Sequence, residues 1–252
     1  MERNIGINTK IITFVFMRTL MLLLQLVLNV SGHQYINGAR LHFVQKNLLY
    51  LKEEPAKFMK EFTQIESARL RLRHFQYADV TLFMGYRNDP LIARYQSWEG
   101  ISELDARTFI QEQKEIQPGI LGQGFQVAIE LKATGALIGD CYFTINTLDH
   151  RQAEIGFTLS REYQGYGYAT EAVSCFLNYA FLTFDLHRII AITDCENIAS
   201  VALLERLGMR REGHFLKNVW FKGKWGDEYL YAILDEEWQS KYNTSPYMKR
   251  KS

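Results

Sequence analysis

The sequence predicts an α+β domain with a mixed sheet, and three observations lead to this prediction. Segments with period-two alternation, together with short apolar runs, are typical of strands. Segments with helical periodicity lie between them, but the two kinds do not alternate strictly, as they do in doubly wound parallel folds. Hydrophobic residues make up 47% and charged residues 23% of the 252 residues. These are ordinary globular values, so a fully disordered or fibrous chain is excluded.

The first predicted strand is Ala68–Arg73, where apolar and charged residues alternate. A short helix is predicted over Asp79–Tyr86, and the Asn-Asp-Pro sequence at 88–90 ends it. The Ser-Glu-Leu-Asp sequence at 102–105 resembles a capping box. It opens a further helix, which the Pro-Gly pair at 118–119 stops.

The centre of the chain reads as three strands and a long helix. Two strands, Phe125–Leu131 and Leu137–Ile145, are joined by a turn at 132–135, and Ala153–Leu159 is a third. A polar loop with glycines follows. Apolar residues then recur at helical spacing from Ala169 to Phe184, the strongest helical signal in the chain.

Three shorter elements complete the predicted domain. Ile189–Thr193 is a buried strand, Ser200–Leu207 a short helix closed by Gly208, and Tyr229–Leu234 a final strand. The basic segment around Trp220 is best explained as a solvated β-hairpin with aromatic packing.

Residues 1–58 differ from the rest. Ile11–Val30 is strongly apolar and ends in small residues that would suit cleavage of a secretory signal. Arg18 near its middle argues against a membrane span. We interpret this leader as an artefact or a poorly ordered extension, with a signal-like segment as the alternative. The domain is predicted over residues 59–240, followed by a basic tail at 241–252.

Charge and cysteine usage exclude several classes of protein. Lys and Arg number 29 against 28 Asp and Glu, a net charge of +1, so nucleic acid is not an expected partner. Three cysteines, Cys141, Cys175 and Cys195, lie in apolar runs and indicate a reducing compartment rather than disulfides. The six histidines lack metal-ligand spacing, so no metal is expected. We expect a cytoplasmic monomer or homodimer without membrane association.

The segment after Ala153–Leu159 carries the chemistry. A tight loop with Gly165 and Gly167 precedes the long helix. The first N–H groups of a helix lack intrahelical acceptors, and the helix dipole is positive there, so such a loop can hold an anion. No Gly-Lys-Ser/Thr sequence follows, and the third glycine of a dinucleotide-binding fingerprint is missing. The residues therefore favour a phosphate cradle, with a plain turn as the alternative.

Gln164-x-x-Gly167-x-Ala169 resembles the Q/R-x-x-G-x-G/A signature of the GNAT (GCN5-related N-acetyltransferase) family. The surrounding residues resemble its RimJ- and RimL-like branch, which acetylates ribosomal-protein N-termini. The resemblance covers roughly residues 66–238 in the right order. Its further segments are Arg69-Leu70-x-Leu72-Arg73, Ile138-Gly139, Asn197-Ile198-Ala199-Ser200, Leu207-Gly208-Met209-Arg210-x-Glu212-Gly213, and Asp227-x-x-x-Tyr231-Ala232-Ile233-Leu234 with Trp238.

This resemblance implies a mostly antiparallel, splayed mixed sheet flanked by helices. It implies acetyl-CoA as co-substrate, and direct transfer to a primary amine of a peptide or small molecule, such as a protein N-terminus, a polyamine or an aminoglycoside. Asn197 and Ser200 would lie near the thiol end. The residues implied for the pantetheine are Phe157, Thr158 and Leu159, and those for the pyrophosphate are Gln164, Gly165, Tyr166, Gly167, Tyr168 and Ala169.

Two residues are candidates for catalysis. Glu154 is either the general base or a carboxylate that only positions the amine, and Asp227 is the fallback base. Ser200 is either the acid or thiolate hydrogen-bond donor, or the N-cap of its helix, or both. Many family members have a tyrosine acid where this chain has Leu204, and Tyr231 is more typical of packing. A non-catalytic acyl-CoA-binding module is the alternative function.

Overall fold

The computed structural model describes residues 61–244, with side chains up to residue 241. The leader at 1–58 and the tail residues 245–252 lie outside the described residues. The strands are β1 (Gln64–Glu66), β2 (Leu70–Arg73), β3 (Phe125–Leu131), β4 (Ala136–Ile145), β5 (Gln152–Leu159), β6 (Arg188–Asp194), β7 (Arg210–Phe221) and β8 (Lys224–Leu234). The helices are α3 (Val80–Arg87), α4 (Pro90–Ala93), α5 (Glu103–Glu115), α6 (Tyr168–Phe184), α7 (Ile198–Leu207) and α8 (Asp235–Thr244).

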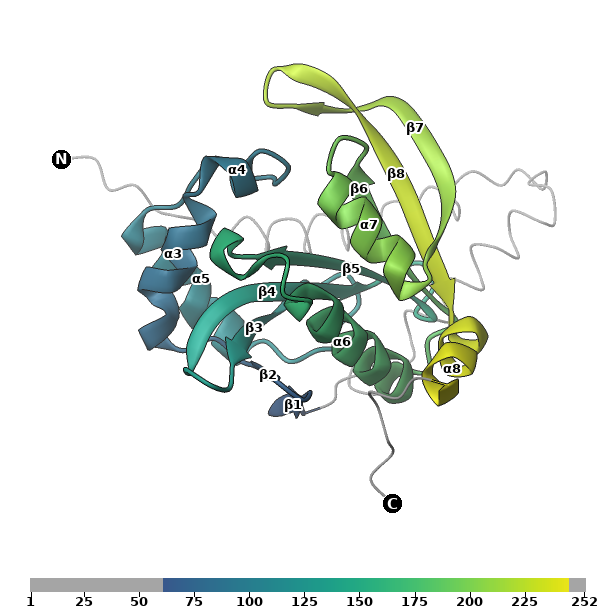
Figure 1. Cartoon of the computed structure of the whole chain (residues 1–252), viewed down its shortest axis with the longest axis horizontal. Helices are drawn as coiled ribbons and strands as arrows, with labels where there is room; N and C mark the ends of the chain where they lie inside the picture. Colours follow the sequence, from purple (N-terminus) through teal and green to yellow (C-terminus); the bar gives the residue numbers. More distant parts are fainter. Residues whose placement is uncertain (1–60, 245–252) are drawn as a thin grey trace, which may run out of the picture. The chain divides into compact units, whose positions relative to one another are not determined.

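The strands form one 8-stranded sheet in the order β1-β2-β3-β4-β5-β6-β8-β7. Every neighbouring pair is antiparallel except β5 and β6. That parallel pair is joined by α6, the crossover that parallel strands require (Figure 1). The predicted α+β class with a mixed, mostly antiparallel sheet is confirmed.

The parallel pair is short, and this positions the site. Cα partners run from Gln152↔Arg188 to Glu154↔Ile190 and then stop. Beyond that point β5 continues to Leu159, paired only with β4, while β6 continues to Asp194, paired with β8. The two strands therefore part after Glu154, as the splayed sheet of the sequence prediction requires.

Side chains alternate along each strand, so both faces of the sheet carry apolar residues. Helices cover each face and bury these residues. The larger core packs the apolar stripe of α6, with Phe176 and Leu177, against residues such as Ile138 and Ile155. The smaller core packs α3 and α5 against the opposite face through residues such as Leu137. Figure 1 shows α3 and α5 together at one end of the sheet and α6 alongside α7.

Most predicted elements are confirmed to within two residues, including the helix that begins after Ser102, whose hydroxyl accepts the Asp105 N–H at 3.2 Å. The break at 88–90 also starts a new element, since Asp89 caps α4 by accepting the Leu91 N–H at 2.9 Å. The helix predicted over Ser200–Leu207 begins two residues earlier: α7 starts at Ile198 with Asn197 as its N-cap. None of the described helices is long and apolar enough to cross a membrane.

Gly139 lets β4 approach β5 closely at the end of the site. A Cβ on Gly139 would lie 2.2 Å from the carbonyl oxygen of Thr158, too close for any side chain. The glycine of the Ile138-Gly139 pair therefore sets the position of the β5 backbone at Thr158.

Candidate active site

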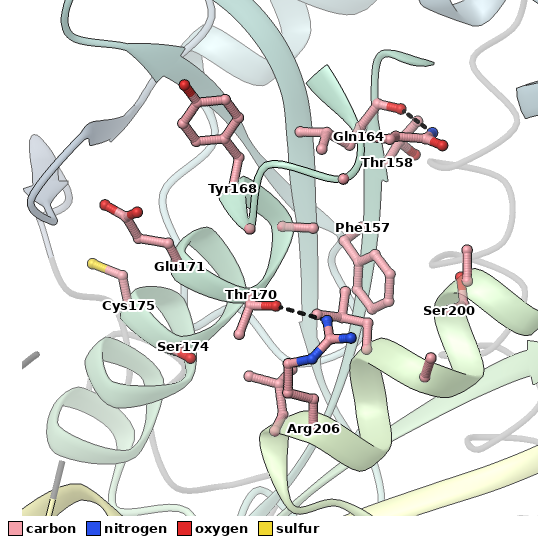
Figure 2. A pocket seen from close by; sticks show the side chains of 18 of the residues that line it. Phe157, Thr158, Gln164, Tyr168, Thr170, Glu171, Ser174, Cys175, Ser200 and Arg206 are labelled. Atoms are coloured by element: carbon pink, nitrogen blue, oxygen red, sulfur yellow. Dashed lines mark hydrogen bonds between the residues drawn. The ribbon is translucent and has the colours of Figure 1, made fainter. Parts of the chain in front are cut away.

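A cleft of about 1440 Å³ opens where β5 and β6 part. The end of β5, the glycine loop, α6, α7 and the α4 segment form its walls (Figure 2). Its volume exceeds the roughly 300–1,000 Å³ of typical small-molecule sites, so it can take a long ligand. The structure brings together most of the predicted cofactor-binding residues in its lining: Phe157, Thr158, Leu159, Gln164, Gly165, Gly167, Tyr168, Ala169 and Asn197, with Ser200.

The glycine loop leaves a row of donors without acceptors. Gly165 and Gly167 have φ values of 85° and 81°, in the left-handed region that favours glycine. Gly167 is the N-cap of α6 and provides no side chain to cap it. Within residues 61–244, the N–H groups from Gly165 to Thr170 have no hydrogen-bond acceptor. Such a row at the positive end of a helix dipole suits an anion.

The side chain of Gln164 fixes the start of this loop from within. Its Nε2 donates to the Leu159 carbonyl oxygen at 3.0 Å, which ties the loop to the end of β5. Figure 2 shows this bond on one side of the cleft and Phe157 projecting between α6 and α7. Gln164 thus holds the loop to the strand rather than adding another donor to the row.

Glu154 is the last residue of β5 that pairs with β6, and it does not line the cleft. Alternation along β5 directs it to the face opposite Phe157. That face also carries Asp140 of β4, which accepts hydrogen bonds from α3. Burial and the nearby Glu228 carboxylate raise the pKa of Glu154. The carboxylate therefore stands at the parting of the strands, on the side away from the glycine loop.

The N-cap of α7 is Asn197 and not Ser200, for which the sequence suggested that role. The Asn197 side-chain oxygen accepts the Ser200 N–H at 3.2 Å, so Asn197 is the N-cap and Ser200 lies in the first turn of α7. In the described part of the chain the Ser200 hydroxyl makes no hydrogen bond, and the residue lines the cleft. It is therefore free to contact a ligand.

Sequence reasoning missed Arg206. Its guanidinium lines the cleft from α7 and donates to Thr170 Oγ1 of α6 at 3.3 Å (Figure 2). It has no carboxylate within ion-pair distance among the described residues. The sequence could have indicated Arg206, because it lies two residues before Gly208, in the helix predicted to contain Ser200, and so places a cation on that helix.

Other candidates lie away from the chemistry. Tyr166 is exposed and does not line the cleft, although its carbonyl belongs to the loop. Tyr231 is fully buried and donates to Glu205 at 3.0 Å, and burial raises its pKa to about 12. Burial also raises the pKa of Cys175, in the cleft wall, to about 11. Among residues 61–244, no three His, Cys, Asp or Glu side chains form a group that could hold a metal ion.

Comparison with known proteins identifies the domain. A family model described as an acetyltransferase (GNAT) domain matches residues 69–210. YnaD, an uncharacterized N-acetyltransferase of Bacillus subtilis, is 37% identical over 174 residues, which are 69% of this chain and 98% of YnaD. The resemblance stated from the sequence is thereby confirmed.

Solved structures agree with the fold. A GNAT-family acetyltransferase from Bacillus anthracis superposes with a TM-score of 0.62 at 33% identity, covering 69% of this chain and all of its own. RimL, a ribosomal L7/L12 α-N-protein acetyltransferase solved with coenzyme A, gives 0.59 at 20% identity, covering 68% of this chain and 97% of its own. At that identity the second likeness speaks for the fold alone.

Proposed function

The chain belongs to the GNAT family of acetyltransferases, and on this premise we propose that it acetylates a primary amine by direct transfer where β5 and β6 part. It is an acetyl-CoA-dependent N-acetyltransferase. The identity of the amine and the roles of individual residues are the content of the proposal. The observation that carries it is the placement of Glu154 at the parting, with its pKa raised.

The residues of the cleft fit acetyl-CoA, which when bound supplies the acetyl group as a thioester. The unpaired N–H groups from Gly165 to Thr170 would receive the diphosphate. Phe157 and Leu159 lie on the stretch of β5 that has lost its β6 partner, so backbone groups there would bond the pantetheine amides. Arg206 supplies a positive charge in the same cleft.

Glu154 would act as the general base. The acceptor amine is protonated at neutral pH and must lose a proton before it attacks. A carboxylate with a raised pKa accepts that proton more readily than an ordinary glutamate does. Since Glu154 faces the α3 side of the sheet and the glycine loop lies on the α6 side, amine and thioester would meet from opposite faces at the parting.

Ser200 would assist departure of the thiol. Its hydroxyl has no other partner within residues 61–244 and lies on the cleft wall beside Asn197. Donation of a hydrogen bond to the sulfur would stabilise the charge that develops as the C–S bond breaks and the N–C bond forms. The amine gives one proton to Glu154, and the departing thiolate takes up one proton to become the free thiol. No net proton is therefore gained or lost by the enzyme over one turnover.

The acceptor proposed first is an α-amine at a peptide N-terminus, the class that RimL acetylates. A polyamine is the second candidate, because Glu228 places another carboxylate near Glu154. Two carboxylates on one face suit an amine that carries a second positive charge.

Thiol release from acetyl-CoA tests the proposal. The full chain is assayed against N-terminal peptides, the same peptides with blocked α-amines, polyamines and aminoglycosides, with Glu154→Gln in parallel. We expect one amine class to raise thiol release well above hydrolysis, and the variant to lose that increase while still binding acetyl-CoA. Binding without acceleration by any amine would instead indicate a non-catalytic acyl-CoA-binding module.

A further inference from the structure

Arg69 lies just before β2 and contacts the glycine loop, about 100 residues along the chain. Its Nε donates to Glu171 Oε2 at 2.6 Å, and its Nη1 donates to the Tyr166 carbonyl oxygen at 3.0 Å. Its guanidinium also stacks on the Tyr168 ring, 4.4 Å from the centroid. One side chain therefore contacts the loop and the first turn of α6 at three points.

The bond to Tyr166 fixes the orientation of a peptide group. In a planar trans peptide the carbonyl and the following N–H point in opposite directions. With the Tyr166 carbonyl held by Arg69, the Gly167 N–H is directed away from Arg69. The loop needs such a restraint, because Gly165 and Gly167 give its backbone more conformational freedom than other residues would.

Glu171 explains why a cation is required beside the loop, where Arg69 and Glu171 both line the cleft. A carboxylate in the first turn of α6 suits the helix dipole but would repel a diphosphate bound at the same helix end. Glu171 accepts the Ser67 hydroxyl and the Arg69 backbone N–H, each at 2.7 Å, in addition to the guanidinium. Burial alone would raise the pKa of Glu171, but these bonds outweigh it and lower the pKa.

We propose that Arg69 is a positioning residue for the co-substrate: it orients the Gly167 peptide and neutralises Glu171, so that the loop is ready for phosphate. This inference rests on the proposed function, in which the diphosphate binds at residues 165–170. Arg69 acts through the loop, and its effect should therefore depend on whether the acyl donor carries phosphates.

The test compares two donors, acetyl-CoA and acetyl-pantetheine, which lacks the nucleotide and its phosphates. For Arg69→Met we expect kcat/KM with acetyl-CoA to fall about tenfold or more, mostly through KM, with kcat nearly unchanged. With acetyl-pantetheine, kcat/KM should stay within about twofold of the parent. Arg69→Lys keeps the charge but loses the two-point geometry, so an intermediate loss is expected.

Arg71→Met is the matched control. Arg71 lies two residues along on the same segment, is similarly exposed, and pairs with Glu66 and Glu130 rather than with the loop. It should affect neither donor by more than about twofold. Melting temperatures of all variants identify any loss that comes from unfolding.

The possible results distinguish a failure of the role proposed for Arg69 from a failure of the proposed phosphate site at residues 165–170. Equal losses with both donors in Arg69→Met, or no loss with acetyl-CoA, would overturn the role of Arg69. A parent enzyme that uses acetyl-pantetheine as well as acetyl-CoA would overturn the phosphate site itself. If Arg69→Met does not fold, Arg69→Lys decides: weaker binding of CoA with unchanged binding of pantetheine, measured calorimetrically, supports the inference, and any other pattern contradicts it.

Discussion

Two polar regions of the molecule differ in how their charges are compensated. Around Arg73, which is buried, the guanidinium donates to both oxygens of Asp79, at 2.7 and 2.9 Å, and to Glu130 at 2.5 Å. Glu130 is also bonded by Arg71 at 2.6 Å. At the candidate active site, by contrast, the Glu228 carboxylate adds to burial in raising the pKa of Glu154, and the loop donors lack acceptors within residues 61–244.

The difference shows which groups the fold uses for its own stability. Buried charges that serve packing are paired, because an unpaired one costs several kcal/mol. Groups left without partners gather at the parting of β5 and β6, where a ligand can compensate them. The cluster around Arg73 and the candidate site are therefore distinguished by whether other side chains of the protein pair with their charged groups, and not by how deeply those groups are buried.

Removal of the Glu154 carboxylate should give the largest effect on activity. Glu154→Gln keeps the size of the side chain but cannot accept the amine proton, so kcat should fall about 10²–10⁴-fold while acetyl-CoA affinity stays. Because the pKa of Glu154 is raised, the acid limb of the parent profile should lie at higher pH than for an ordinary glutamate. The loss should shrink as pH rises and the amine deprotonates. Equal activity of parent and variant from about pH 6 to 10 would show that Glu154 is not the base, and Asp227 would be tested next.

Breaking the compensated cluster should give the opposite result, a loss of stability without a loss of chemistry. Arg73→Met leaves Asp79 buried without its cation and Glu130 paired with Arg71 alone, and should lower the free energy of unfolding by about 3–5 kcal/mol. Urea titration measures it, with kinetics recorded where the variant is fully folded. Arg107→Met, which removes an exposed pair with Glu103, is the control and should cost no more than about 0.5 kcal/mol. A similar loss of stability in Arg73→Met and Arg107→Met would show that the buried cluster around Arg73 does not stabilise the fold more than an exposed ion pair does.

A side chain in the glycine loop should act on binding. Gly167→Val forces a β-branched residue into a left-handed conformation, which costs about 1–2 kcal/mol, and would displace the donors around it. We expect acetyl-CoA to bind about tenfold more weakly and its stabilisation against heating to be reduced to match. An unchanged thermal shift would remove the loop from the phosphate site.

Ser200→Ala should have a smaller effect, confined to turnover. Loss of one hydrogen bond to the sulfur is worth about 0.5–1.5 kcal/mol, or up to about tenfold in kcat. Since Asn197 is the cap, the melting temperature should not change. A variant that loses stability but keeps kcat would reverse this assignment.

The smallest expected effect is a gain in stability for Glu154→Gln. A carboxyl with a raised folded pKa ionises more readily in the unfolded chain, so ionisation favours unfolding. The variant should therefore be slightly more stable at neutral pH, and the gain should vanish at low pH, where both states are protonated. Urea titrations at several pH values measure it. A gain that is independent of pH would point to packing instead.

Local patterns predicted the fold well where one face of an element is buried. The apolar stripe of α6 and the strands β3 to β5 carry the periodicity that burial imposes. By contrast β7, residues 210–221, is an edge strand that is exposed on both faces, so no alternation marked its bounds. Its pairing with β8 confirms the β-hairpin predicted around Trp220, whose ring contacts that of Trp225.

The site was predictable only as far as its motifs are local. Gln164 to Ala169 span one loop and the first two residues of α6, and the sequence predicted that they lie together. The contact of Arg69 with Glu171, 102 residues apart, depends on the tertiary fold. The N-cap was only one possible role of Ser200, and Asn197 holds it, because both residue types suit an N-cap and the local sequence does not choose between them.

The parting of β5 from β6 gives the sheet an edge in its own interior. Beyond Glu154 one side of β5 has no neighbouring strand in the part of the chain that the structure describes, while β4 pairs along the other side. Outer edges invite pairing between molecules, but this inner edge is flanked by α6 and α7, so a slender ligand with amide groups can serve as a surrogate strand. On the proposed binding mode a bound co-substrate would complete the sheet, and its free concentration in the cell would become part of what keeps the chain folded.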